Sequence, residues 1–442
     1  MSFLRSSLLL LLASMAPALH AQSLAAMPDV TYNGGTGLVT SFAVSGDTLY
    51  IGGLFDTVDG SSRSNLAAIN LNTGHVTAWD PGASGSVAGI GLSNDGSTLY
   101  VGGSFTSLGG QSRNYLGAVS TASGSATAWA PDPNNWVTAL TVNKATGNVF
   151  ALGDFTQASG ASTTANHVMG VTASGTVTGY GGSTSFVGSD YRSIATSTDG
   201  STLYIAHIGG KSWDAAGGGS VTRWGVSALE TSDFLATAFN PSPQEATFAS
   251  PGQSLAVHGN SLYIGGQFNN IGGVSNTTAG TDRARLAKFD MNADGSDGTL
   301  DTTFATINSA SGPNSGGTRG LVFIGNKLFV VGGFTNYAGS GVGGVALVDP
   351  NTGAIDSTYN VTTSSSLFGA NPTYTYGDST NGYLFISANG ISGATVLGAT
   401  QTNNFVALST PSVVPEPTTY AAIFGCAALG FVVWQRRRRP VR

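Results

Sequence analysis

The sequence predicts an all-β fold, because glycine is abundant and short apolar runs recur along the chain. The chain has 442 residues, of which 64 are Gly and only 9% are charged. Glycine costs backbone entropy inside a helix, so this composition favours many turns between short strands. Apolar residues make up 41% of the chain and fall in regular runs, which indicates a packed core and not disorder.

One apolar motif occurs seven times. Its fullest form is Gly-Gly-x-Phe at the end of an apolar strand, and the fourth and seventh copies lack the second half. The copies are LYIGGLF (49–55), LYVGGSF (99–105), VFALGDF (149–155), LYIAHIG (203–209), LYIGGQF (262–268), LFVVGGF (328–334) and LFISANG (384–390). Because one apolar strand precedes each copy and another follows it, every repeat contains at least three strands in succession.

A fourth strand ends six of the repeats. The six are VTAWDP (76–81), ATAWAP (126–131), VTGYGG (177–182), LATAFNP (235–241), LDTTFAT (300–306) and IDSTYN (355–360). The seventh repeat has no such strand, whereas DVTYN (29–33) stands before the first repeat. A ring explains this displacement, since an N-terminal strand can complete the last unit and leave no open edge.

Four strands per repeat of about 50 residues are typical of a β-propeller. The sequence therefore predicts a seven-bladed β-propeller over residues 29–410, with the N-terminal strand closing the last blade. A β-solenoid is the alternative fold, and it would not require the displaced strand. The Gly-Gly strand ends resemble kelch blades. The longer pattern, best seen at 285–304, is similar to the bacterial delta-sixty propeller repeats and implies the same fold.

The N-terminus reads as a secretory signal peptide over residues 1–21. Arg5 supplies the positive charge, and SLLLLLASM (7–15) is an apolar core too short to span a bilayer. Cleavage is expected after Ala18 or Ala21. A membrane anchor is the alternative, which the short length disfavours.

The C-terminus predicts a membrane-associated tail. A linker (411–419) leads into an apolar run (420–434), and a basic segment (435–442) follows. Fifteen helical residues span roughly 22 Å, so the predicted transmembrane helix is short for a hydrocarbon core of about 30 Å. Arginines beyond the run would remain cytoplasmic, which places the large domain outside the membrane.

This tail resembles the PEP-CTERM sorting signal of Gram-negative bacteria, on Pro415, Glu416 and Pro417 with the apolar run and arginines behind them. The resemblance implies that a membrane-embedded exosortase recognises the Pro-Glu-Pro motif and removes the tail. It implies transient anchoring in the inner membrane, followed by release to the cell surface or extracellular matrix. An ordinary single-pass anchor is the alternative.

Charge and cysteine content limit the partners and the means of stabilisation. Six of the 17 basic residues lie in the two predicted ends, which leaves 11 against 23 acidic residues and a net charge near −12. A domain with this negative net charge is not expected to bind nucleic acid, because the phosphate backbone is also negatively charged. Cys426 is the only cysteine, so no intrachain disulfide can form.

A ligand is expected at the face that carries the loops between second and third strands and the connections between blades. Carboxylates beside aromatic platforms there could bind sugars. The candidates are Asp56, Asp59, Arg63, Arg113, Trp136, Asp154, Trp213, Asp214 and Tyr337. Structural roles are the alternative for most of them. Arg63 and Arg113 recur at one repeat position, which favours pairing between blades, and Trp79 and Trp129 recur on outer strands as packing residues.

A second candidate site is a calcium loop. Asp290, Asn292, Asp294, Ser296 and Asp301 follow the ligand spacing of such a loop, with Gly295 at its sixth position. Aspartate replaces the usual glutamate at the last position, and no helices flank the segment. An Asx-rich hairpin turn is the alternative, because similar turns recur at 70–74 and 349–353.

No serine-nucleophile elbow, phosphate loop or helical His-Glu-x-x-His motif is present. Together with the export and sorting signals, this predicts a non-catalytic surface or matrix protein that binds or organises exopolysaccharide or another surface partner. A glycan-active lyase or hydrolase is the alternative, since the fold does not decide function.

Overall fold

The structure is a computed structural model, and it describes residues 24–25, 27–158, 167–181, 191–216, 218–243, 252–272, 281–282, 284–307, 317–334, 337, 344–362, 373–388, 395–396, 399–400 and 405–409. These residues belong to one compact unit, Gln22–Ser409. The predicted signal peptide, sorting motif, helix 420–434 and basic tail lie outside them. Within the described ranges, no helix is long and apolar enough to cross a membrane.

The unit is built from antiparallel sheets that follow the chain, each starting with an inner strand and moving outward. The first sheets in chain order are β4 (Leu38–Ser45), β5 (Thr48–Leu54) and β8 (Leu66–Asn70); β9 (Val87–Leu92), β10 (Thr98–Gly103) and β13 (Leu116–Ser120); and β14 (Val137–Val142), β15 (Val149–Gly153), β16 (Val168–Val171) and β17 (Val177–Gly181). They are followed by β18 (Tyr191–Thr196), β19 (Thr202–Asp214) and β20 (Ser220–Glu230); and by β21 (Gly252–His258), β22 (Ser261–Gly266), β25 (Leu286–Met291) and β26 (Gly298–Leu300). The last sheets are β27 (Thr318–Ile324), β28 (Lys327–Gly332), β29 (Gly344–Val348) and β30 (Ile355–Thr362); and β31 (Thr373–Asp378), β32 (Tyr383–Ala388), β35 (Phe405–Ser409) and β1 (Leu24–Ala25).

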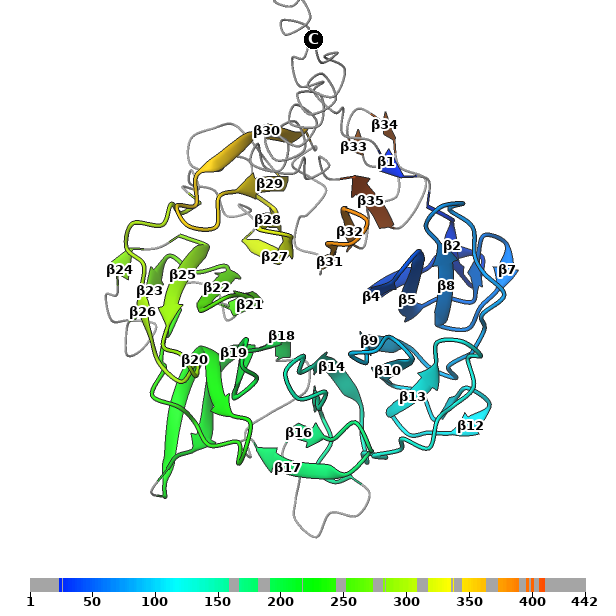
Figure 1. The fold of residues 1–442 in the computed structure, drawn as a ribbon, viewed down its shortest axis with the longest axis horizontal. Helices are drawn as coiled ribbons and strands as arrows, with labels where there is room; N and C mark the ends of the chain where they lie inside the picture. Colours follow the sequence, from blue (N-terminus) through cyan, green and yellow to red (C-terminus); the bar gives the residue numbers. More distant parts are fainter. Residues whose placement is uncertain are drawn as a thin grey trace, which may run out of the picture. The chain divides into compact units, whose positions relative to one another are not determined.

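The inner strands close a ring. Contacts run from β4 to β9, β14, β18, β21, β27 and β31, and β31 contacts β4 again. Figure 1 shows the sheets of this unit set radially around a common axis. Sheets arranged in this way around an axis form a β-propeller, so the prediction of an all-β propeller is confirmed.

The fourth strand is reduced in several sheets. Beside β8, β13 and β20 it shrinks to single bridges, which join Ile69 to Val76, Val119 to Ala126 and Leu229 to Ala236. Short hairpins also follow the second strands, at β6 (Thr57–Val58) with β7 (Ser61–Ser62), and at β11 (Ser107–Leu108) with β12 (Gln111–Ser112). Further pairs are β23 (Asn270–Ile271) with β24 (Thr281–Asp282) and β33 (Thr395–Val396) with β34 (Ala399–Thr400).

The N-terminus completes the last sheet, but not with the predicted segment. Strand β1 pairs with β35, with Leu24 opposite Leu408 and Ala25 opposite Ala407. The predicted closing strand 29–33 forms β2 (Val30–Tyr32), which pairs with β3 (Gly35–Thr36) and β6. An N-terminal strand does complete the last sheet, but the prediction that residues 29–33 form it is wrong by about one strand. In pairing register, Leu24 takes the place that Val76 has in the first blade, so the buried Met27 corresponds to Trp79.

The Gly-Gly-x-Phe motif is explained by close packing at the end of each second strand. A Cβ on the first glycine would reach the next inner strand, 2.5 Å from Val87 at Gly52 and 2.5 Å from Val137 at Gly102. A Cβ on the second glycine, at Gly103, would lie 2.1 Å from the Ser86 carbonyl oxygen. The glycines therefore let adjacent strands approach each other.

The phenylalanine of the motif anchors the start of the third strand. Phe55, Phe105, Phe155 and Phe268 are fully buried, and each backbone carbonyl accepts an N–H from the residue before the third strand. Those donors, Asn65, Tyr115, His167 and Arg285, all have positive φ. Where the motif is lost, at 206–210, strand β19 continues to Asp214 and forms a long hairpin with β20.

Neighbouring blades are joined by apolar clusters and by polar contacts at their hairpins. Tyr50 packs edge-on against Trp79 with ring centroids 5.1 Å apart, and Trp79 Nε1 donates to Ser120 O of the next blade at 3.0 Å. Trp129 Nε1 does the same to Thr172 O at 2.8 Å. Both indoles are at most 9% exposed, which confirms that Trp79 and Trp129 are packing residues.

Candidate functional site

Two aromatic residues of the predicted ligand face are buried. Trp213 is 1% exposed within the long β19–β20 hairpin, and Tyr337 is 0% exposed with its hydroxyl donating to Gly353 O at 3.0 Å. Neither ring is accessible to a ligand in this structure. The prediction that these two rings serve as aromatic platforms for a sugar is therefore wrong, because each ring is packed in a hydrophobic cluster beside its own sheet.

The repeated arginines fasten the outer segment of their own blade. Arg63 Nη2 donates to Thr77 O at 2.6 Å, and Arg113 Nη2 donates to Thr127 O at 2.5 Å. Arg223 makes the same bond to Thr237 O at 2.8 Å. The structural role is thus supported, but the contact lies within a blade and not between blades. The arginine hydrogen bond helps to hold the fourth, outer segment of the blade, which is joined to the third strand by a single β-bridge.

The acidic candidates on this face make local contacts. Asp56 Oδ2 accepts from Asn33 N at 2.7 Å, and Asp59 Oδ2 lies 2.8 Å from His75 Nδ1. Asp214 ends strand β19, and its carbonyl accepts from Ala236 N. Backbone hydrogen bonds bring two predicted pairs together: Arg63 N donates to the carbonyl of Asp56, and Asp154 N donates to the carbonyl of Trp136, whose side chain is 53% exposed.

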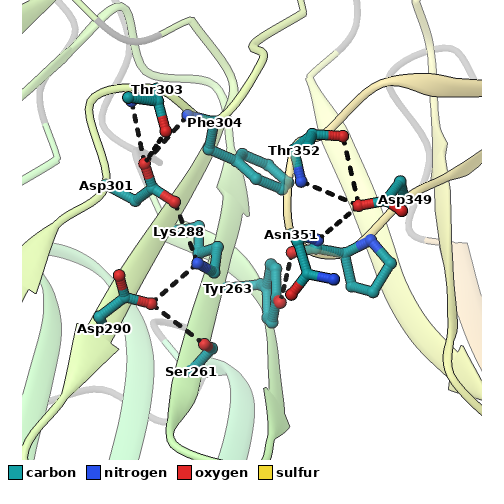
Figure 2. Close-up of polar contacts among 11 residues, drawn as sticks. Ser261, Tyr263, Lys288, Asp290, Asp301, Thr303, Phe304, Asp349, Asn351 and Thr352 are labelled. Carbon is teal, nitrogen blue, oxygen red and sulfur yellow. Dashed lines mark hydrogen bonds and ion pairs between the residues drawn. The ribbon is translucent and has the colours of Figure 1, made fainter.

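Two of the predicted calcium residues, Asp290 and Asp301, face Lys288, as Figure 2 shows. Lys288 Nζ lies 2.8 Å from Asp290 Oδ1 and 3.0 Å from Asp301 Oδ2, and the lysine side chain is 9% exposed. Asp301 Oδ1 also accepts from Thr303 N and Phe304 N. Both carboxylates are therefore paired with the Lys288 ammonium group, and the Asp301 carboxylate also accepts hydrogen bonds from the backbone of a turn.

The other calcium candidates close a hairpin turn. Asp294 Oδ1 accepts from Ser296 N and Ser296 Oγ, and Asn292 Oδ1 accepts from Asp297 N. Among the residues that the structure describes, no three His, Cys, Asp or Glu side chains are placed to hold a metal ion. The arrangement matches the Asx-rich turn that the sequence left open as the alternative.

Charge and hydrogen bonding shift the pKa values in this network. Burial raises the pKa of Asp301, but hydrogen bonds from Thr303 and Lys288 outweigh it and lower the pKa to about 2. Burial lowers the pKa of Lys288, whereas its bonds to Asp290 and Asp301 raise it above the usual value. Lys288 and Asp301 therefore stay ionised over a wide pH range.

A cavity of about 440 Å³ lies at the axis of the ring, at the opposite end from the predicted face. Its walls come from the last residues of β4, β9 and β14 and from Tyr376 on β31. Leu38, at the other end of β4, pairs with Leu54, from which the second-to-third strand loop departs. Sequence reasoning missed the cavity because its lining residues come from separate repeats.

The cavity combines apolar walls with a polar rim. Phe42, Ile90, Leu92, Leu140 and Val142 supply the walls. Ser45, Ser93, Asn94, Asp95 and Lys144 supply the rim from the hairpins between first and second strands.

Hydrogen bonds connect and orient the rim. Asn94 Nδ2 donates to Lys144 O at 3.0 Å, and Lys144 Nζ donates to Leu92 O at 3.0 Å. Hydroxyls of Ser93 and Ser97 lower the pKa of Asp95 to about 2, so this carboxylate is anionic at neutral pH. Burial lowers the pKa of Lys144.

No protein-family model matches the chain, and no curated protein matches it. Among solved structures, it is similar to the β-propeller domain of Cps50 (Swd1) from Myceliophteria thermophila, at 10% identity and a TM-score of 0.48. It is also similar to the computationally designed protein Ika8, at 12% identity and a TM-score of 0.46. Each comparison covers 87% of this chain and 100% of the other.

Proposed function

We propose that this protein is an exported, seven-bladed β-propeller that binds and organises exopolysaccharide or another partner at the cell surface or in the extracellular matrix. The signal peptide and the Pro415-Glu416-Pro417 tail support export followed by exosortase processing. The seven copies of the strand motif support the blade number. Low charge and a surface of hydroxyls and amides suit a matrix of hydrated sugars.

The cavity at the axis is the observation on which the binding proposal rests. Ligand sites of a few hundred Å³ are usually apolar, with a small number of polar groups that fix orientation. Here the partly exposed Leu92 and Leu140 walls suit the C–H face of a sugar ring, while Ser93, Asn94 and Asp95 suit its hydroxyls. A cavity of about 440 Å³ is large enough for a short oligosaccharide.

A glycan array with the mature protein, combined with an assay for reducing-sugar release, tests this function. We expect retention of specific glycans without turnover. Ser45→Trp should block the cavity mouth and abolish retention, whereas Ser123→Trp, on an exposed hairpin turn, should leave it intact. Release of reducing sugars would contradict the binding role and favour the glycan-active enzyme.

A further inference from the structure

Lys144 carries a charge at a turn position that is uncharged in the other six blades. It follows Asn143 in the turn between β14 and β15, and it lines the cavity at the ring axis. In pairing register, the equivalent residues of the other turns are Gly46, Asn94, Thr198, Gly259, Gly325 and Ser379. Because the repeated turn does not require a lysine, the reason for this charge must be sought in the cavity.

The turn that carries Lys144 is fixed to both neighbouring blades. Asn143 is 1% exposed, and its Nδ2 donates to Gly200 O of the next blade at 2.8 Å. Asn143 Oδ1 accepts from Ala145 N within the turn at 3.0 Å. The Lys144 carbonyl accepts from Asn94 Nδ2 of the preceding blade at 3.0 Å. The backbone at Lys144 is therefore held in place before a ligand arrives.

The Lys144 ammonium group has no carboxylate within 4.0 Å among the described residues, whereas Lys288 and Lys327 each pair with an aspartate. Lys144 Nζ donates to Leu92 O in the cavity wall at 3.0 Å, which uses one of its three N–H donors. Burial lowers the pKa of Lys144, so the ammonium group has lost part of its hydration. A partly desolvated cation gains more from contact with an anion than a cation in bulk water does.

Asp95 places the opposite charge on the same rim. Its Oδ1 accepts from Ser93 Oγ at 2.6 Å and from Ser97 N at 3.1 Å, and its Oδ2 accepts from Ser97 Oγ at 2.8 Å. A carboxylate oxygen can accept about two hydrogen bonds, so Oδ2 can take a further one from a sugar hydroxyl. The rim therefore suits a glycan that has a carboxylate on one ring and only hydroxyls on the next.

We propose that the cavity at the ring axis selects an acidic glycan, because Lys144 binds the carboxylate of a uronic acid residue. A hydrogen bond between an ammonium group and a carboxylate is about twice as strong as one between neutral groups. The negative net charge of the chain acts over long distances and is screened by salt, whereas this contact is direct. The inference rests on the proposed function and specifies the class of glycan that the cavity binds.

The test uses the full chain and a hyaluronan tetrasaccharide, which has a carboxylate on every second ring, with its methyl ester as the uncharged probe. In isothermal titration, the acid should bind about tenfold more tightly than the ester. Lys144→Gln should remove this preference and leave binding of the ester unchanged, which also shows that the variant is folded. Lys144→Arg should keep the preference, because it keeps the charge.

Lys327→Gln is the matched control. It removes a lysine from the β27–β28 hairpin at the same end of the ring, where Lys327 pairs with Asp356, and it should change neither affinity. Equal affinity of the wild-type protein for acid and ester, or a preference that survives Lys144→Gln, would overturn the role of Lys144 while the cavity remains a glycan site. Failure of the acid, the ester and every glycan on the array to bind would instead overturn the proposed function, and the acidic-glycan assignment with it.

Discussion

Gly53, Gly103 and Gly153 show how single residues set the spacing of this fold. A Cβ at these positions would lie 1.9, 2.1 and 2.0 Å from a backbone carbonyl oxygen of the inner strand. Backbone atoms cannot move aside as a flexible side chain can. The second glycine of the motif is therefore needed to admit the bulge of the inner strand.

Gly103→Ala is expected to lower the free energy of unfolding by about 2 kcal/mol or more, because the new methyl group collides with the Ser86 carbonyl. Gly35→Ala is the control, since its Cβ would meet nothing closer than 3.6 Å. Urea denaturation measures both. Equal midpoints for the two variants would refute the packing explanation.

The pH dependence of stability should reflect Asp301. Its folded pKa of about 2 lies below the ordinary 3.8, so its contribution is present above about pH 4 and is lost as the pH falls toward 2. The loss should amount to about 2 kcal/mol. Asp301→Asn should flatten this acid limb in urea denaturation from pH 2 to 7. A variant curve that parallels the wild-type curve would show that the ion pair with Lys288 contributes nothing to acid sensitivity.

At the scale of elements, closure of the last sheet depends on strand β1, whose residues Leu24 and Ala25 pair with β35. Strand β1 covers the outer edge of β35, and the adjacent Met27 is 7% exposed in a cluster with Phe42 and Phe385. A sheet edge without this strand would present unpaired N–H and C=O groups.

A chain that starts at Asp29 should unfold at lower denaturant concentration, or aggregate, compared with one that starts at Gln22. The seven residues removed include β1 and Met27, whereas β2 and its pairing with β6 are kept. Circular dichroism during denaturation and light scattering measure the two outcomes. If both chains unfold at the same midpoint, β1 is dispensable for the ring.

At the scale of the whole molecule, the blades are joined in series at their hairpins. Inter-blade hydrogen bonds run from the donors Asn94 to Lys144 O, Asn143 to Gly200 O, Thr198 to Gly259 O, Gly325 N to Ser379 Oγ and Asn381 to Gly46 O. Tyr263 also donates to Pro350 O across a blade boundary at 2.7 Å (Figure 2). Many small contacts therefore stabilise the ring in place of a disulfide.

The sorting proposal also belongs to this scale. Replacing Pro415, Glu416 and Pro417 with alanine should yield a chain that keeps its tail and remains in the membrane fraction, because the exosortase would lose its recognition motif. Intact-mass spectrometry of the wild-type and variant proteins measures the C-terminus. A wild-type protein that ends at Arg442 would contradict processing.

The sequence by itself determined the fold class and the order of the strands. Alternating apolar residues and repeated turns are local, so they could be read without knowledge of the fold, and the Gly-Gly-x-Phe motif marked each second strand. The closing strand was assigned one strand too late, because DVTYN mimics the outer-strand pattern while Leu24–Ala25 has only two paired residues.

The candidate sites were decided by the tertiary structure. The cavity draws residues from four repeats, and only the closed ring brings such distant positions to one axis. Burial of Trp213 and Tyr337 likewise depends on packing between elements. Local patterns predict secondary structure well, whereas sites formed by distant repeats require the three-dimensional arrangement of those repeats.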